Sequence, residues 1–485
     1  MLLAHRIRID PSADQRDYFA RAAGTARRVW NWALTEWQRQ AALGLRPNAM
    51  ALKKQFNRIK YSDPAWLDAN GQPWLHTIHR DAHAQPFANL ARAWSRYFDQ
   101  RRAGQLVQPP RFKKKGRCAD SFYIANDRFR LKGMHVMLPK VGRVALRETL
   151  RWPGRILGAS VSREAGNWFL SVQVDVPEQD ARRSRTRDGV LGIDLGVSSA
   201  ATLSTGEKIA APRPLKAALR RVRIRSRRLS RKLDAAKAAA GIEGRIPNGV
   251  RLPVSNNRSK TARVLARLQA RIGRVRRDFT HKLTTCLCRE SQAIVIEDLH
   301  VKGMLANVRL SRAIADIGFY EIRRQLRYKA LLYGTSLMLA DRWYPSSKLC
   351  SKCGIKNGSL TLDQRSWTCG GCGAEHDRDV NAAINLQRLA TSAFVAATAL
   401  PVASQAVTPG TSVGLTPGEA GKSRLSCTSM VSRTARGRKR TMHTSVHVFD
   451  RSNPAFYNML ETRSTTSRTH TRIDTNATGA ASRPG

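Results

Sequence analysis

The chain has 485 residues and is strongly basic, because 85 Lys and Arg stand against 35 Asp and Glu for a formal net charge of +50. A surface this positive attracts polyanions, so nucleic acid is the expected partner, and an enzyme for acidic substrates or a neutral scaffold is disfavoured. Hydrophobic residues make up 42% of the chain, which is enough for a core and excludes wholesale disorder. The length predicts roughly two to four structural units.

No targeting or membrane segment is evident in the sequence. The N-terminus lacks the apolar stretch of a secretory signal, and no apolar run approaches the roughly 20 residues that cross a bilayer. Eight cysteines are too few for a disulfide scaffold, and four of them form two CxxC pairs, which indicates a metal in a reducing compartment. We therefore expect a cytoplasmic, nucleoid-associated protein with no membrane partner.

The N-terminal part predicts a helical unit followed by a β unit. A strand is expected at 1–10, and apolar residues three and four apart predict helices at 14–43 and 82–102, within a helical domain at 11–118. Its basic loop at 109–116 is expected to contact phosphate through Arg111, Lys113, Lys114 and Lys115. From 121 to 176, within a unit expected at 119–186, the apolar period changes to two, which predicts a small β-barrel. Its strands are expected at 122–124, 136–138, 144–146, 158–161 and 168–176.

The next unit, at 187–345, predicts a mixed α/β domain. Its expected elements are a strand at 190–193, a hairpin at 200–210, a strand at 293–296, a helix at 317–333 and a strand at 336–340. Inserted into it, the segment 213–287 predicts a basic antiparallel helical hairpin. Like charges this dense would repel one another on a lone helix, so contact with a polyphosphate is favoured. The expected contact residues are Arg220, Arg221, Arg223, Arg225, Arg227 and Arg228.

Two CxxC pairs give the most specific signal in the sequence. They lie within 346–376 and are separated by fifteen residues. This spacing is typical of a zinc ribbon, in which four thiolates close a tetrahedral structural site with no open position for a substrate. The predicted Zn²⁺ ligands are Cys350, Cys353, Cys369 and Cys372. Catalysis must then lie elsewhere.

Acidic residues stand at the ends of three predicted elements. Asp194 ends the strand at 190–193, Glu297 ends the strand at 293–296, and Asp377 and Asp379 begin a helix after the ribbon. Buried carboxylates are costly unless they share cations. Converging carboxylates from two strand ends and a helix start can bind two Mg²⁺ about 4 Å apart, which suits phosphodiester hydrolysis.

These motifs resemble a known family. Gly192-Ile-Asp-Leu-Gly196, Val295-Ile-Glu-Asp-Leu299 and Asp377-Arg-Asp-Val-Asn-Ala-Ala383 resemble the three split RuvC motifs of the TnpB (OrfB) family of bacterial insertion sequences, relatives of the type V CRISPR effectors. The segments 343–354 and 319–330 are also similar to that family. The resemblance spans residues 1 to about 390 in the family's order.

The resemblance implies an RNA-guided, Mg²⁺-dependent DNA endonuclease that binds a guide RNA made from the element's end and cuts a double-stranded DNA target. By motif position Asp194, Glu297 and Asp379 carry over as the catalytic Mg²⁺ ligands. Asp377 is the alternative in the third motif and could cap the helix instead, while Asn381 is expected to support the site by hydrogen bonding. The implied fold is an RNase H-like (RuvC) mixed sheet with an inserted helical hairpin and a zinc ribbon, preceded by a helical recognition unit and a β-barrel wedge.

The implied domain order assigns 1–10 to the wedge barrel, 11–118 to recognition, 119–186 to the wedge, 187–345 to the nuclease, 346–376 to the ribbon and 377–390 to the last RuvC element. Residues 391–485 read as a disordered tail. Two alternatives stay open for function: a transposase that recognises DNA directly, and a non-catalytic nucleic-acid-binding regulator of transposition. Both a monomer and a dimer are compatible with the sequence.

Overall fold

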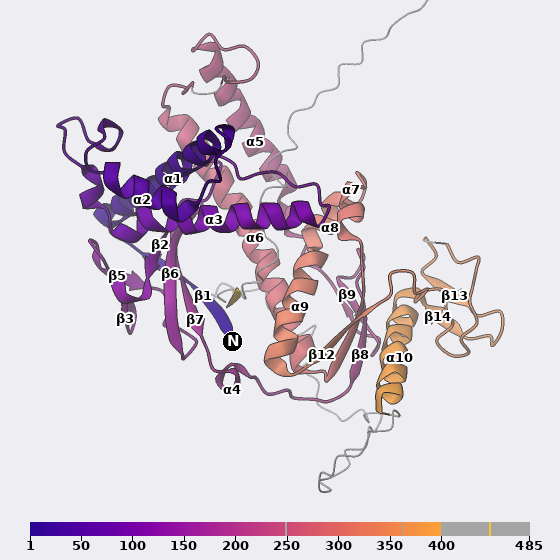
Figure 1. The fold of residues 1–485 in the computed structure, drawn as a ribbon. Helices are drawn as coiled ribbons and strands as arrows, with labels where there is room; N and C mark the ends of the chain where they lie inside the picture. Colours follow the sequence, from indigo (N-terminus) through magenta and orange to yellow (C-terminus); the bar gives the residue numbers. More distant parts are fainter. Residues whose placement is uncertain (248–249, 362, 399–445, 448–485) are drawn as a thin grey trace, which may run out of the picture. The chain divides into compact units, whose positions relative to one another are not determined.

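The computed structural model describes residues 1–247, 250–361, 363–398 and 446–447, and Figure 1 shows its elements. Helices α1 (Ala13–Ala42), α2 (Ala49–Ile59) and α3 (Arg80–Arg102) pack together after the first strand. Helix α1 begins at Ser12, which forms a capping box with Gln15. Large apolar side chains fill the space between the three helices, including Trp30, Leu34, Phe56, Trp66 and Phe87. The sequence predicts α1 and α3 to within two residues at each end but misses α2.

The first sheet is antiparallel and joins the N-terminal strand to strands from 121–175. Its order is β2-β6-β7-β1-β5-β4-β3, and β15 (Val446–His447) also pairs with β1. In the described residues β2 and β3 stand at the two ends and do not pair with each other, so closure into a barrel stays a prediction. The strand bounds are β1 (Leu2–Asp10), β2 (Ser121–Ala125), β3 (Arg130–Lys132), β4 (His135–Leu138), β5 (Gly142–Leu146), β6 (Arg155–Glu164) and β7 (Asn167–Asp175).

The second sheet is mixed and has the order β10-β9-β8-β11-β12. Strand β8 is parallel to β11, β11 is parallel to β12, and β9 and β10 continue the sheet in antiparallel fashion. The carboxyl ends of β8 and β11 therefore lie at the same edge of the sheet. The bounds are β8 (Val190–Asp194), β9 (Ala201–Leu203), β10 (Lys208–Ile209), β11 (Ala293–Glu297) and β12 (Ser336–Ala340).

Helices α5 (Pro214–Ala238) and α6 (Asn256–Arg289) form the predicted hairpin and pack side by side (Figure 1). The buried carboxylate of Asp316 fixes its base, because it accepts the backbone N–H groups of Leu215 and Lys216 and pairs with Arg276 on α6 at 2.8 Å. A carboxylate at a helix N-terminus satisfies otherwise unpaired donors. Three shorter helices are α4 (Glu178–Ala181), which precedes the hairpin, and α7 (Val301–Ala306) and α8 (Ser311–Ile317), which follow it.

The expected helix at 317–333 is confirmed as α9 (Phe319–Tyr333), which begins two residues later than predicted. The short helix α8 precedes it and was not predicted from the sequence. Gly318 lies between them with a φ of 82°, a left-handed conformation that glycine adopts without strain and that stops an α-helix.

Helix α10 (Arg378–Thr398) packs directly against β8. The contact is possible because Gly192 has no side chain: a Cβ there would lie 1.9 Å from the carbonyl oxygen of Ala383 and 2.5 Å from the backbone nitrogen of Gln387. The side chain of Gln387 also donates to the carbonyl of Val190 at 2.8 Å. These contacts hold the start of α10 beside the end of β8.

We expect Gly192→Ala to destabilise the protein by about 3 kcal/mol or more, because both atoms in the way belong to backbone and the helix must move. Thermal or denaturant unfolding checks this. Gly273→Ala is the matched control, since Gly273 lies inside α6 with open space around its Cβ position. It should stabilise the fold by about 0.5–1 kcal/mol. Equal stability of the two variants would show that α10 does not pack this tightly.

Helix α10 extends eight residues past Ala390, where the sequence predicts the tail to begin. Apart from 391–398 and the strand β15, the predicted tail lies outside the described residues. The third sheet pairs β13 (Ser366–Thr368) with β14 (Glu375–Asp377) within the ribbon. Among the described residues, no helix has the length and apolar character needed to span a bilayer.

Candidate functional site

The fold brings the three predicted acids together at one edge of the second sheet. Asp194 and Glu297 are the last residues of the adjacent parallel strands β8 and β11, and Asp379 lies in the first turn of α10, which packs on β8. Burial, followed by the charges of Glu297 and Asp379, raises the pKa of Asp194 from 3.8 to about 8. Acids that interact this strongly share one electrostatic environment.

The oxygen atoms of the three carboxylates are nevertheless farther apart than the ligand atoms of a preformed metal site. Among the described residues, only the four ribbon cysteines form a group of three or more potential ligands whose atoms lie within 4.8 Å of one another. Arg378 lies 3.4 Å and Arg365 3.7 Å from the carboxylate of Asp379, and both arginines oppose the rise in the pKa of Asp194. The edge therefore combines three acids with two flanking guanidinium groups.

Asp377 and Asp379 occupy different environments. Asp377 is 41% exposed, pairs with Lys208 at 2.6 Å and accepts the backbone N–H of Val380, so it caps α10. Although burial raises it, Lys208 and that N–H hold the pKa of Asp377 below its usual range. Asp379 is only 12% exposed and acts electrostatically on Asp194. The geometry therefore favours Asp379 over Asp377 as the third acid of the site.

Asn381 supports the site indirectly. Its side-chain oxygen accepts the N–H of Ser351, and its side-chain nitrogen donates to the carbonyl of Leu349 at 2.6 Å. One turn further along α10, Asn385 donates to the carbonyls of Ser346 and Leu349. The two asparagines thus hold the start of the ribbon on the helix that carries Asp379.

Ser346 connects this segment to the acids and was missed by sequence reasoning. It is buried, and its hydroxyl donates to the carboxylate of Glu297 at 2.6 Å. The only available signal was the four-residue spacing of Asn381 and Asn385, which places both on one face of a helix. That spacing does not identify the serine they support.

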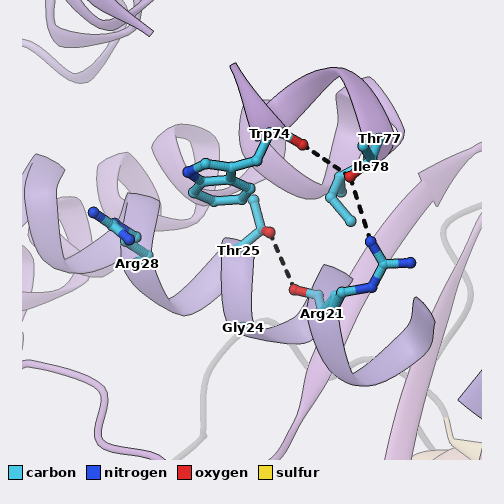
Figure 2. A pocket seen from close by; sticks show the side chains of 7 residues that line it. All are labelled: Arg21, Gly24, Thr25, Arg28, Trp74, Thr77 and Ile78. Atoms are coloured by element: carbon cyan, nitrogen blue, oxygen red, sulfur yellow. Dashed lines mark hydrogen bonds between the residues drawn. The ribbon is translucent and has the colours of Figure 1, made fainter. Parts of the chain in front are cut away.

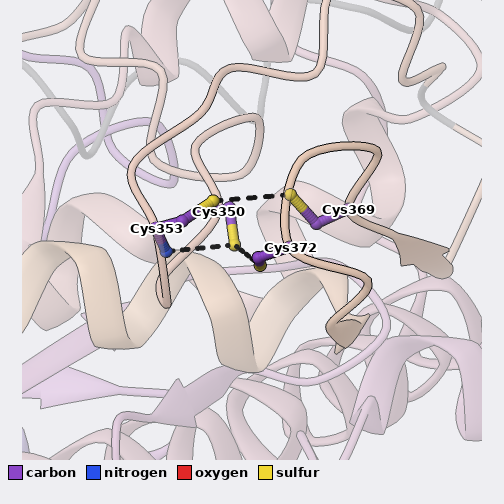
Figure 3. A group of neighbouring side chains, drawn as sticks. All are labelled: Cys350, Cys353, Cys369 and Cys372. Atoms are coloured by element: carbon purple, nitrogen blue, oxygen red, sulfur yellow. Dashed lines mark hydrogen bonds between the residues drawn. The ribbon is translucent and has the colours of Figure 1, made fainter.

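The four cysteines form a compact group (Figure 3). The sulfurs of Cys350 and Cys372 lie 3.6 Å apart, as do those of Cys353 and Cys369. Two thiolates bound to one tetrahedral zinc ion at 2.3 Å would be about 3.8 Å apart. The donor set and its spacing therefore fit a structural Zn²⁺ site.

Each cysteine pair lies in the same kind of backbone turn. The N–H of Cys350 donates to Ile355 and that of Gly354 donates back to Cys350, while Cys369 repeats this pattern with Ala374 and Gly373. Although burial raises the pKa of the Cys350 thiol, N–H donors in its turn and the ring of His376, 3.0 Å away, lower it overall. A lower thiol pKa favours the thiolate that binds metal. His376 is a further residue that the spacing did not reveal.

The predicted phosphate-binding residues differ in how far their side chains are exposed to solvent. On α5, Arg220, Arg221, Arg223, Arg227 and Arg228 are exposed and Arg225 is partly buried. In the basic loop Arg111 and Lys115 are exposed, and so is Lys114. Lys113 differs, because its ammonium lies 4.0 Å from the ring centroid of Trp30 and its backbone bonds to Asn31 on both sides. Burial lowers its pKa. Lys113 therefore anchors the loop to α1.

A cavity of about 440 Å³ lies elsewhere, on α1 and the turn at 74–78 (Figure 2). Arg21, Arg28 and Trp74 contribute to its lining, and Arg28 lies over the ring of Trp74 at 5.6 Å. None of the three acids lines this cavity.

The pKa of Asp194 makes a prediction for stability in metal-free buffer. Between pH 3.8 and about 8 the folded protein keeps a proton on Asp194 that the unfolded chain has released. Stability must therefore fall as pH rises through this interval. We expect Asp194→Asn to remove this dependence and to stabilise the protein by about 2 kcal/mol or more at pH 8. Denaturant unfolding at pH 5 and pH 8 with a chelator present measures both effects, and parallel pH profiles for the two proteins would contradict the prediction.

Three segments of the chain match models of known protein families. Residues 170–308 match the family described as "Probable transposase" (OrfB of the IS605 type), residues 319–386 match "Cas12f1-like, TNB domain", and residues 1–44 match a "Helix-turn-helix domain" of the same OrfB type. The three matches follow the chain order of the helical unit, the mixed sheet and the ribbon.

Curated relatives cover most of the chain. A "Putative RNA-guided DNA endonuclease" of Streptomyces pristinaespiralis is 34% identical over 395 residues, which is 79% of this chain and 88% of the relative. A protein of the same description from Mycobacterium tuberculosis is 32% identical, covering 79% and 86%. The chain therefore belongs to the TnpB (OrfB) family, whose members are related to the type V effectors. A solved complex of Cas12f1 with guide RNA and target DNA aligns with 78% of this chain and 83% of its own at 16% identity and a TM-score of 0.43.

Proposed function

We propose that this protein is an RNA-guided DNA endonuclease of an insertion sequence, in which Asp194, Glu297 and Asp379 form the cleavage site. The observation that carries the proposal is the electrostatic coupling of the three acids at one sheet edge, in a family whose curated members carry that description. In a chain with a net charge of +50, clustered acids repel one another without attracting the substrate. Such a cluster is best explained by cation binding.

The second sheet is proposed to be a RuvC-like, RNase H-type nuclease domain, and the first to be the wedge. Three antiparallel strands followed by two parallel ones give adjacent carboxyl ends on β8 and β11, and these support the nuclease assignment. The three carboxylates are suited to hold Mg²⁺, which when bound supplies an activated water and stabilises the leaving oxygen. Ser346 orients Glu297, and Arg365, which is 58% exposed beside Asp379, is suited to contact a polyanionic substrate.

The ribbon cysteines are proposed to hold one structural Zn²⁺, and the exposed arginines of α5 to contact nucleic-acid backbone. In a guided nuclease, base pairing with RNA supplies sequence specificity, and the protein needs only to hold phosphates and recognise shape. This division of labour explains why so basic a chain displays many guanidinium groups. It also predicts RNA and double-stranded DNA partners and a location at the nucleoid.

The test is to express the full chain with the DNA that flanks it in its element, and to sequence any RNA that copurifies. A discrete RNA that matches the element's end is expected, together with Mg²⁺-dependent cutting of a matching DNA that Asp194→Asn abolishes. DNA end joining without RNA would instead support a directly DNA-recognising transposase. Nucleic-acid binding with biological effects that survive Asp194→Asn would support a non-catalytic regulator. Either result would overturn the proposal.

A further inference from the structure

Trp343 differs from every other tryptophan of the chain. All ten tryptophans lie in the described residues, and nine of them are buried or partly buried, whereas Trp343 is 85% exposed. Among the large exposed aromatic side chains in the described part of the chain, Phe112 comes next at 46%. Single exposed apolar residues are common on protein surfaces, so exposure alone carries no inference. The surroundings of Trp343 add two further observations.

The backbone around Trp343 is hydrogen-bonded within its turn, whereas the ring is exposed. The N–H of Trp343 donates to the side chain of Asp341 at 2.8 Å, and the N–H of Tyr344 donates to the carbonyl of Asp341. Tyr344 donates in turn through its hydroxyl to the carbonyl of Asn385 on α10. The turn at 341–346 therefore presents the indole from a fixed position, which lowers the entropy that a ligand must overcome.

This turn lies beside the proposed cleavage site. Arg342 pairs with Asp298, the residue after Glu297, at 3.2 Å, and Ser346 donates to Glu297 itself. Three residues span at most about 11 Å, so Trp343 stands within that distance of Ser346 along the chain. The side chain of Arg342, the residue before Trp343, is 46% exposed although it pairs with Asp298. Exposed aromatic side chains that stack on bases, together with basic side chains that follow the backbone, are the means by which proteins bind single-stranded nucleic acid.

We propose that Trp343 is a stacking platform for a base of the single DNA strand that enters the cleavage site, within a few nucleotides of the phosphate that is cut. The inference rests on the proposed function for the identity of that strand. Stacking is tolerant of sequence because every base has an aromatic face, as a guided nuclease requires. No covalent step is assigned to the residue.

The test uses the full chain, with the RNA that copurifies with it, in an Asp194→Asn background that does not cut. Binding of a single-stranded DNA carrying 2-aminopurine at successive positions is measured for Trp343→Ala, Trp343→Phe and Leu331→Ala. Leu331 is the matched control, an exposed apolar residue of α9 outside the proposed site. Trp343→Ala is expected to weaken binding by about 5- to 100-fold and to remove the fluorescence quenching at one position. Trp343→Phe should keep most of both, and Leu331→Ala all of both.

The salt dependence of binding separates stacking from phosphate contact. The slope of affinity against salt should be the same for Trp343→Ala and its parent, because the indole neutralises no phosphate. Unchanged affinity and quenching in Trp343→Ala would overturn the inference, as would an equal loss in Leu331→Ala. Failure of the proposed function is recognised separately, because the protein with Asp194 intact would then not cut matching DNA at all.

Discussion

Asp379→Asn is expected to lower the rate of DNA cleavage on the order of 10³-fold or more. The substitution removes one of the three carboxylates proposed to hold Mg²⁺. The transition state of phosphodiester cleavage then loses several kcal/mol of charge stabilisation. Guide binding should be unaffected, because Asp379 is only 12% exposed at the sheet edge. The measurement is single-turnover cleavage of a matching DNA at saturating Mg²⁺, alongside RNA content and a thermal melt.

Asp377→Asn is the matched control, two residues away on the same motif. It loses an ion pair with Lys208 that is about 40% exposed on both sides, and such pairs contribute little. Asparagine also caps a helix as well as aspartate does, so the bond to Val380 survives. Cleavage should stay within about threefold of the parent protein. If Asp377→Asn were inactive and Asp379→Asn active, the assignment of the third acid would be reversed.

Cys350→Ser is expected to abolish zinc binding and unfold the ribbon at 346–376. A structural zinc site contributes on the order of 10 kcal/mol to the fold that it closes, far more than the two-strand sheet of β13 and β14 can supply. Because Ser346 lies at the start of this segment and donates to Glu297, cleavage should be lost as well. Zinc content and limited proteolysis of the ribbon report the structural effect independently of activity.

Cys118→Ser is the control for this substitution. Cys118 is a free, partly exposed thiol that donates to the carbonyl of Lys114 and lies outside the four-cysteine group. One zinc ion per chain and normal proteolysis are expected for this variant. A Cys350→Ser protein that kept its zinc and a protected ribbon would remove Cys350 from the ligand set.

Local patterns predicted the strands that end in Asp194 and Glu297, the helices α1, α3, α5 and α6, and the cysteine set. Each of these predictions depends on hydrophobic periodicity or residue spacing within one short segment. The helix, strand or metal-binding turn that causes the pattern is formed by that same segment. The helix at 317–333 was predicted and corresponds to α9, whereas α8 was missed because its seven residues are too few to show a clear helical period.

Motif position selects Asp379 over Asp377, and the tertiary structure adds a physical reason for that choice. Both acids lie in one short motif, and only the contacts of Lys208 and Val380 show which of them is already engaged in holding the helix. The same is true of Lys113, which reads as a phosphate ligand in a basic run but packs on Trp30.

The sequence by itself determined the basic character of this protein, its family, the identity of its acids and the four thiols suited to zinc, because residue type and spacing carry that chemistry. Only the tertiary structure decided how the acids meet. The pairing of β8 with β11 and the close contact at Gly192 each join segments more than a hundred residues apart. The hydrogen bond from Ser346 to Glu297 joins residues that are 49 apart in the sequence. Contacts between distant segments are set by packing, and no local pattern encodes which surfaces will meet.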